Sequence, residues 1–103
     1  EAVETQKVKV RSEVEDKLSE LQWLEDQMYI ADLNLEKIKI QHKAKVSQAS
    51  DGLIREEEVE GSNRLMLQAK LDWLESVVAY ETARLELMVL TGQAMNIEGG
   101  YPN

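Results

Sequence analysis

The feature that most constrains this chain is a long opening segment without a helix breaker. No glycine or proline occurs from Glu1 to Ser47, and nearly every residue there is a fair helix former. A break follows in the stretch QASDGL, Gln48 to Leu53, where Ser, Asp and Gly favour turns over helix interiors. A second helical pattern then runs from Ile54 to Thr91, with Gly61 inside it. The sequence therefore predicts two long helices joined by one turn.

The element boundaries follow from these breaks. We expect a single helical hairpin over residues 1–103, with a helix over about 3–47, a tip over 48–53, a helix over about 54–91 and a C-terminal linker over 92–103. Gly92 is placed to stop the second helix, because glycine readily takes the left-handed conformation that ends helices. Since the chain opens on a residue other than Met within a helical pattern, we also expect it to be part of something longer.

The apolar residues suit an elongated helical protein. The chain has no Phe, two Trp and three Tyr, whereas a globular domain of this size usually builds its core around several aromatics. Charged residues of both signs make up 31% of the sequence, which is typical of coiled coils. The predicted fold class is all-α, a long antiparallel two-helix coiled-coil hairpin.

Charge and composition also exclude some classes of function. A formal net charge of -8 argues against a nucleic-acid partner, because neutralising phosphates requires clustered Lys and Arg. The absence of Cys removes disulfides and thiolate metal sites. No apolar run approaches the roughly 20 residues that span a bilayer, so we expect no membrane span within this chain.

The spacing of apolar residues indicates how many neighbours each helix has. In the first helix, one stripe follows heptad steps of three and four, with skips. Its members are Val3, Val10, Val14, Leu21, Leu24, Met28, Ala31, Leu35 and Ile38. A second stripe is offset by two residues, or about 200° around the helix. Its members are Trp23, Ile30, Leu33, Ile40 and Ala44.

The second helix repeats this arrangement. One stripe comprises Met66, Ala69, Trp73, Tyr80, Ala83, Leu87 and Leu90, and the other comprises Leu67, Leu71, Leu74, Val78, Leu85 and Met88. An isolated hairpin needs only one stripe per helix. A second stripe predicts neighbours on both flanks, as in a bundle or a closed ring of helices, and a tendency to self-associate when it is exposed.

Candidate ligand and catalytic residues favour structural roles. His42 is the only histidine, and a metal site needs several convergent ligands. Glu56, Glu57, Glu58 and Glu60 are interpreted as favourable negative charge at a helix N-terminus together with a solvated face. Trp23 and Trp73 are interpreted as packing residues on stripes that could face each other. Without a nucleophile–base pair or a phosphate-cradling loop, we expect no enzyme activity, no cofactor and no metal.

A set of short motifs follows in order from the tip to the end of the second helix. The Gly-Leu pair at 52–53 precedes an acidic-aliphatic pair at 58–59, a Tyr-x-x-Ala-x-x-x-Leu pattern at 80–87 and Leu-Thr-Gly at 90–92. In this order and spacing, over about residues 16–92, the chain resembles a helical hairpin of the TolC-like outer membrane efflux proteins. Asp51 departs from the pattern, since the family often has an aliphatic residue there.

The resemblance implies a transport role, in multidrug efflux or type I secretion. The parent would carry two such hairpins and β-strands per subunit and would assemble as a trimer in a Gram-negative bacterium. Its hairpins would form an α-helical tunnel in the periplasm, below the outer membrane. The tip would contact a periplasmic adaptor (membrane fusion) protein through Ala49, Ser50, Asp51, Gly52 and Leu53. The alternative from the residues alone is a generic coiled-coil interaction or scaffolding domain not involved in transport.

Overall fold

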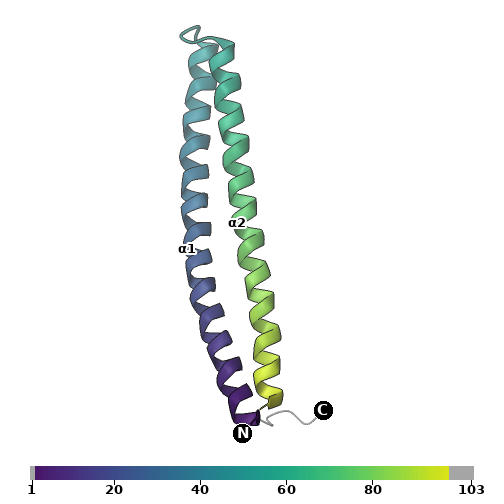
Figure 1. Ribbon diagram of the computed structural model, residues 1–103. Coiled ribbons are helices and arrows are strands. Elements are labelled where there is room, and N and C mark those ends of the chain that lie inside the picture. Colours follow the sequence, from purple (N-terminus) through teal and green to yellow (C-terminus); the bar gives the residue numbers. More distant parts are fainter. Residues whose placement is uncertain (1, 98–103) are drawn as a thin grey trace. The chain divides into compact units, whose positions relative to one another are not determined.

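Two long helices make up the described part of the chain (Figure 1). A computed structural model describes the backbone of residues 2–97 and the side chains of residues 2–93. Helix α1 spans Ala2–Ser50 and helix α2 spans Glu56–Ile97, and no strand occurs between residues 2 and 97. The predicted all-α, antiparallel two-helix hairpin is confirmed.

The hairpin divides into two compact units, which are described separately. The terminal unit combines residues 1–25 with 78–103, and the tip unit comprises residues 26–77. In the terminal unit, Lys17 Nζ of α1 lies 3.6 Å from Glu86 Oε1 of α2. In the tip unit, His42 Nδ1 of α1 lies 3.0 Å from Ser62 Oγ of α2. Each unit is thus a pair of helix segments that run in opposite directions and touch along one side.

The contact side of each helix, here called the seam, repeats every three or four residues. In the terminal unit the partly or fully buried seam residues are Lys7, Val10, Val14, Lys17, Leu21 and Leu24 on α1, and Tyr80, Ala83, Leu87 and Leu90 on α2. In the tip unit they are Met28, Ala31, Leu35, Ile38, His42, Lys45 and Ala49 on α1, and Val59, Ser62, Met66, Ala69, Trp73 and Ser76 on α2. This is heptad spacing, and it buries Val10, Leu35, Ala69 and Ala83 to 7% exposure or less.

The first stripe predicted for each helix therefore forms the seam, with one exception. Val3, predicted as the start of the α1 stripe, is 49% exposed. It lies in the first turn of α1, where the helix begins. The skips in the apolar pattern are filled by Lys7 and Lys17, and His42 and Lys45 continue the same spacing beyond Ile38.

The tip ends α1 with a Schellman motif. The Leu53 N–H donates to the Gln48 carbonyl at 2.8 Å, and the Gly52 N–H donates to the Ala49 carbonyl at 3.0 Å. Gly52 has a φ of 76°, the left-handed conformation that this motif requires and that glycine adopts without a Cβ clash. The two bonds satisfy carbonyls that the end of a helix would otherwise leave unpaired.

The helix ends differ from the predicted boundaries. α1 continues to Ser50 instead of ending near residue 47, because the last turn is closed by the Schellman bonds. α2 begins at Glu56 instead of near 54 and continues through Gly92 to Ile97. Gly92 is therefore not a helix stop, since it lacks the positive φ of a C-terminal glycine. Residues 98–103 of the predicted linker lie outside the described residues.

Candidate functional site: two exposed apolar stripes and the hairpin tip

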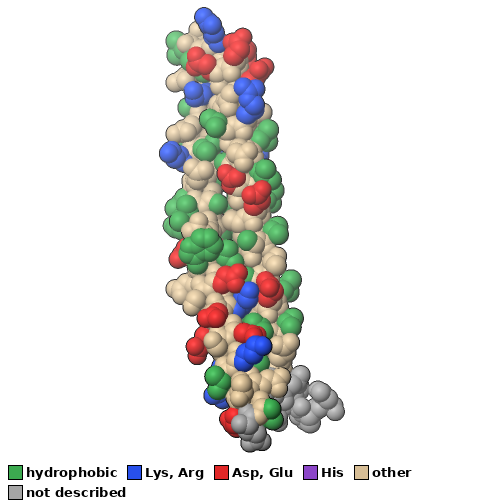
Figure 2. All heavy atoms as spheres, viewed as in Figure 1, with side chains coloured by type: hydrophobic (Ala, Val, Ile, Leu, Met, Phe, Trp, Pro, Cys, Tyr) green, Lys and Arg blue, Asp and Glu red, His purple; other side chains and the backbone are tan. Residues whose placement is uncertain are grey.

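The second apolar stripe of each helix is exposed on the hairpin surface. In the tip unit, the α1 outer stripe comprises Ile30, Leu33, Ile40 and Ala44, and the α2 outer stripe comprises Leu67, Leu71 and Leu74. The six large members are 48–68% exposed. In the terminal unit, Trp23, Val78, Leu85 and Met88 are exposed as well. Figure 2 shows hydrophobic side chains in green at the surface among charged ones.

The two outer stripes face away from the seam. Members of the α1 outer stripe follow a seam residue by two positions, which turns them about 200° from the seam. Leu67 and Leu74 of the α2 outer stripe follow a seam residue by one position, a rotation of about 100°, and Leu71 follows one by two positions, a rotation of about 200°. The stripes therefore lie on opposite edges of the tip unit. Contiguous exposed aliphatic residues on a regular helix form a surface onto which another helix packs.

Charge differs between the two helices near the tip. On α1, Lys37, Lys39, Lys43 and Lys45 occur without any acidic residue from position 37 to 50. On α2, Glu56, Glu57 and Glu58 occupy the first turn and Glu60 follows. The predicted placement of this acidic run at a helix N-terminus is confirmed, and it is favourable because the N–H groups of the first turn carry partial positive charge.

The five predicted contact residues lie together in one turn. Ala49 is partly buried on the seam, while Ser50, Asp51, Gly52 and Leu53 are exposed. Leu53 is 73% exposed, and a Cβ placed on Gly52 would meet no atom within 4 Å. The turn thus presents one large apolar side chain and an open backbone, a combination that suits protein contact. Contact with an adaptor stays a prediction.

His42 belongs to the seam of the tip unit. It forms a hydrogen bond with Ser62, which is 6% exposed, so the pair is a polar contact within a mostly apolar seam. Sequence reasoning missed Ser62 because serine does not count as apolar, although the heptad spacing of α2 includes its position.

The two tryptophans have different surroundings. Trp73 is partly buried on the seam of the tip unit, and its carbonyl accepts a 2.6 Å hydrogen bond from the Ser76 hydroxyl. Trp23, in the terminal unit, is 59% exposed on the outer stripe of α1. The expectation that their stripes face each other is wrong for Trp23, because its position two residues after Leu21 turns it away from the seam.

Lys17 is a charged seam residue with a perturbed pKa. Its ammonium donates a 2.8 Å hydrogen bond to Glu20 and lies 3.6 Å from Glu86 of α2. The hydrogen bond to Glu20, followed by the attraction of the Glu20 and Glu86 carboxylates, raises the pKa of Lys17 above 10.5, against the opposing effect of desolvation. The lysine stem covers the seam while its ammonium stays at the surface, as long cationic side chains do at helix interfaces.

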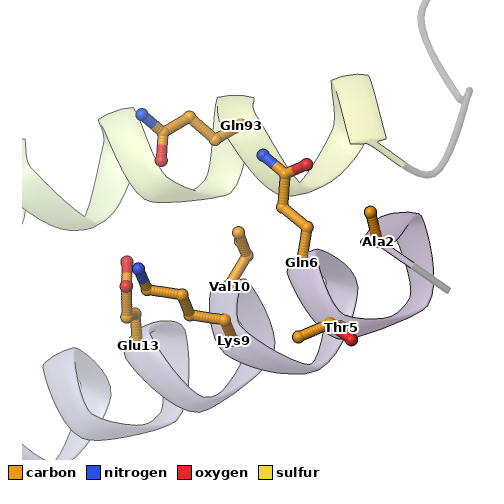
Figure 3. A pocket seen from close by; sticks show the side chains of 7 residues that line it. All are labelled: Ala2, Thr5, Gln6, Lys9, Val10, Glu13 and Gln93. Carbon is orange, nitrogen blue, oxygen red and sulfur yellow. The ribbon is translucent and has the colours of Figure 1, made fainter.

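An open groove lies in the terminal unit, lined by Ala2, Thr5, Gln6, Lys9, Val10, Glu13 and Gln93 (Figure 3). Val10 and Gln6 point from α1 toward α2. The lining residues include a single acid, Glu13, and a single base, Lys9. It offers no pair of carboxylates and no nucleophile–base pair.

Two further observations concern ions and membranes. Among the described residues, no group of three or more His, Cys, Asp or Glu side chains converges where it could hold a metal ion. Neither described helix contains a stretch both long and apolar enough to cross a bilayer. Comparison of the chain with protein-family models, with curated proteins and with solved structures finds no match.

Proposed function

We propose that this chain is a periplasmic helical-hairpin segment of a TolC-like outer membrane efflux duct in a Gram-negative bacterium. It forms part of the α-helical tunnel wall and contacts a periplasmic adaptor protein at its tip. The role is structural, in transport, without enzymatic activity or cofactor. The observation that carries the proposal is the pair of exposed aliphatic stripes on opposite edges of the tip unit, which are the surfaces a wall segment needs on its two flanks.

The exposed stripes favour a wall over a free-standing hairpin. The seam already pairs α1 with α2, so Leu33 and Leu71 are not needed to hold the hairpin together. Covering such residues with neighbouring helices removes apolar surface from water at about 25 cal/mol per Å². In a tunnel, the charged residues between seam and stripe would face the solvent inside and outside the wall.

The tip supports the adaptor contact. Gly52 and Leu53, the Gly-Leu pair of the motif resemblance, lie in a defined turn instead of a variable loop. Leu53 projects an apolar side chain at 73% exposure, which gives a partner helix an anchor. A rigid turn loses little conformational freedom when it binds, so it suits a docking point.

The alternative is a generic coiled-coil interaction or scaffolding domain. The seam favours it, because its heptad spacing is unbroken in both units and pairs the two helices without outside help. On this reading, the outer stripes would bind helices of an unrelated partner and the tip would be an ordinary turn. The two functions differ in whether Leu53 matters for binding.

The deciding experiment measures binding to the helical hairpin of a periplasmic adaptor. We expect the chain to bind, and Leu53→Asp to abolish binding while the circular dichroism of the helices is unchanged. Leu18→Asp is the matched control, since Leu18 is also exposed, at 52%, but lies in the terminal unit. Unchanged binding by the Leu53 variant would sink the tip assignment, and no binding to any adaptor would favour the scaffolding domain.

A further inference from the structure

One peptide bond of the chain joins an aspartate to a glycine, and it lies at the hairpin tip. Asp51–Gly52 is the only Asp-Gly pair in the sequence, which has no Asn-Gly pair. It falls within residues 51–55, which join the end of α1 to the start of α2. The other aspartates all lie inside the two helices, at Asp16, Asp26, Asp32 and Asp72. Asp51 is therefore the one aspartate that lies outside a helix and is followed by a residue without a side chain.

An Asp-Gly pair can rearrange without an enzyme. The amide nitrogen of Gly52 attacks Cγ of the protonated Asp51 carboxyl group, the N–Cγ bond closes a five-membered succinimide ring, and the carboxyl hydroxyl leaves as water with the amide proton. Water then adds to one of the two ring carbonyls. Opening at Cγ restores aspartate, whereas opening at the former main-chain carbonyl gives isoaspartate, whose main chain runs through the β-carbon. The water released is regained, so the net change is an isomerisation without oxidation or reduction.

The surroundings of the attacking nitrogen are open. Asp51 and Gly52 are both exposed, and a Cβ placed on Gly52 would meet no atom within 4 Å. Inside a helix, the peptide group after an aspartate is held by hydrogen bonds along the helix, and the next side chain shields its nitrogen. Gly52 has no such side chain, and glycine permits the backbone rotation that brings its nitrogen and the Asp51 Cγ together.

The Schellman motif opposes the reaction. The Gly52 N–H, whose nitrogen is the nucleophile, donates to the Ala49 carbonyl at 3.0 Å, and the Leu53 N–H donates to the Gln48 carbonyl at 2.8 Å. The nitrogen can attack only when these bonds open. Because the turn lies at the exposed end of a helix, it can open locally while the seam stays formed. The rate of isomerisation thus depends on the fraction of time for which the turn is open.

We propose that Asp51–Gly52 is a modification site at which the folded hairpin isomerises to isoaspartate, at a rate that the Schellman turn restrains. The proposal goes beyond the proposed function and does not depend on it, since the reaction requires only the turn. The product has one additional methylene group in its main chain and a free α-carboxylate beside it. Both changes displace the Gly52 and Leu53 N–H groups from the carbonyls of Ala49 and Gln48, so the modified tip loses the Schellman motif.

Ageing of the intact chain tests the site. After incubation for weeks at physiological temperature in a neutral buffer, peptide mapping by mass spectrometry with electron-transfer fragmentation should find isoaspartate at position 51. Positions 16, 26, 32 and 72 should stay at the level of the fresh protein. Asp51→Glu is the first control and should lose the signal, because glutamate would have to close a less favourable six-membered ring.

A second control separates the effect of the turn from that of the residue pair. Gln27→Gly places a glycine after Asp26, inside α1, and Gln27 is only partly buried, so the helix should persist, as circular dichroism would check. In this variant we expect isoaspartate to accumulate at position 51 several times faster than at position 26. Equal rates at the two positions would show that the pair alone sets the rate, and would overturn the role of the turn.

The unfolded chain provides the remaining comparison. In guanidinium chloride, where the Schellman bonds are lost, isomerisation at position 51 should be several times faster than in the folded chain, and equal rates would overturn the restraint by the turn. Isoaspartate that forms in the unfolded chain but never in the folded chain would overturn the modification site itself. The isoaspartyl fraction, isolated by chromatography, should melt at a lower temperature than the unmodified chain, and an unchanged melting temperature would contradict loss of the Schellman motif.

Discussion

Two leucines separated by one residue on α1 provide the sharpest test of the distinction between seam and outer stripe. Leu35 is 5% exposed on the seam of the tip unit, and Leu33 is 51% exposed on the outer stripe. Truncating a buried leucine to alanine typically costs about 2–5 kcal/mol. We expect Leu35→Ala to fall at the lower end, about 2–3 kcal/mol, because a two-helix seam is thin and its neighbours can close around the lost atoms.

Leu33→Ala should behave differently at low protein concentration. Half of the side chain is already in water, and alanine has a slightly better helix propensity than leucine, so the expected loss is about 0.5 kcal/mol or less. Urea unfolding followed by circular dichroism separates the two variants. With a slope of about 1.5 kcal/mol per M, Leu35→Ala should lower the midpoint by about 1–2 M and Leu33→Ala by at most about 0.3 M.

The reverse order should hold for self-association. Leu33→Ala should weaken it and Leu35→Ala should leave it unchanged, provided that the latter is measured where the hairpin is folded. Equal losses of stability in the two variants would refute the assignment of seam and stripe. So would a larger loss for Leu33→Ala at a concentration where ultracentrifugation shows only monomers.

Three further predictions concern the turn, the seam and pH. Gly52→Ala should lower the melting temperature by several degrees, since a side chain in the left-handed region costs about 1–2 kcal/mol. Gly92→Ala, inside α2 with open space at its Cβ, should instead raise stability by about 0.5–1 kcal/mol. Equal effects of the two substitutions would refute the assigned turn. Ser62→Ala should cost about 1 kcal/mol by removing the hydrogen-bond partner of His42, and in a double-mutant cycle the two positions should be coupled. Because the pKa of Lys17 is raised on folding, its charge contributes stability below pH 10.5 that is lost as pH rises through the folded-state value. The free energy of unfolding of the wild type, relative to that of Lys17→Met, should therefore decrease above pH 10.5. A pH-independent difference between the two proteins would contradict this.

The sequence predicts the seam well because heptad spacing determines which face of a helix meets its partner. Ala69 and Ala83 are among the most buried residues, at 2% and 1% exposure, and both belong to the predicted stripe of α2 that forms the seam. The apolar pattern could not identify Lys17 or Ser62, since it considers apolar residues only. Lys17 fits the seam through its aliphatic stem, and Ser62 fits through its small size. Extending the three-and-four spacing through those gaps would have found them.

Helix ends and outer surfaces were harder to predict. Gly52 and Gly92 are the same residue type near an expected helix end, yet only Gly52 has the positive φ that ends a helix. That difference depends on the bonds around each glycine, which the residue type does not specify. Trp23 shows a similar limit: an aromatic side chain is expected to be covered, and in this chain its helical phase leaves it exposed.

The turn at Gly52 also has a consequence for the order in which the chain folds. The contact of His42 with Ser62 closes a much shorter loop than that of Lys17 with Glu86, and short loops lose less chain entropy on closing. We therefore expect the tip unit to form first and the terminal unit to follow as the helices zip together. On that pathway, strain introduced at Gly52 slows folding, while truncations near Val10 and Leu90 mainly speed unfolding.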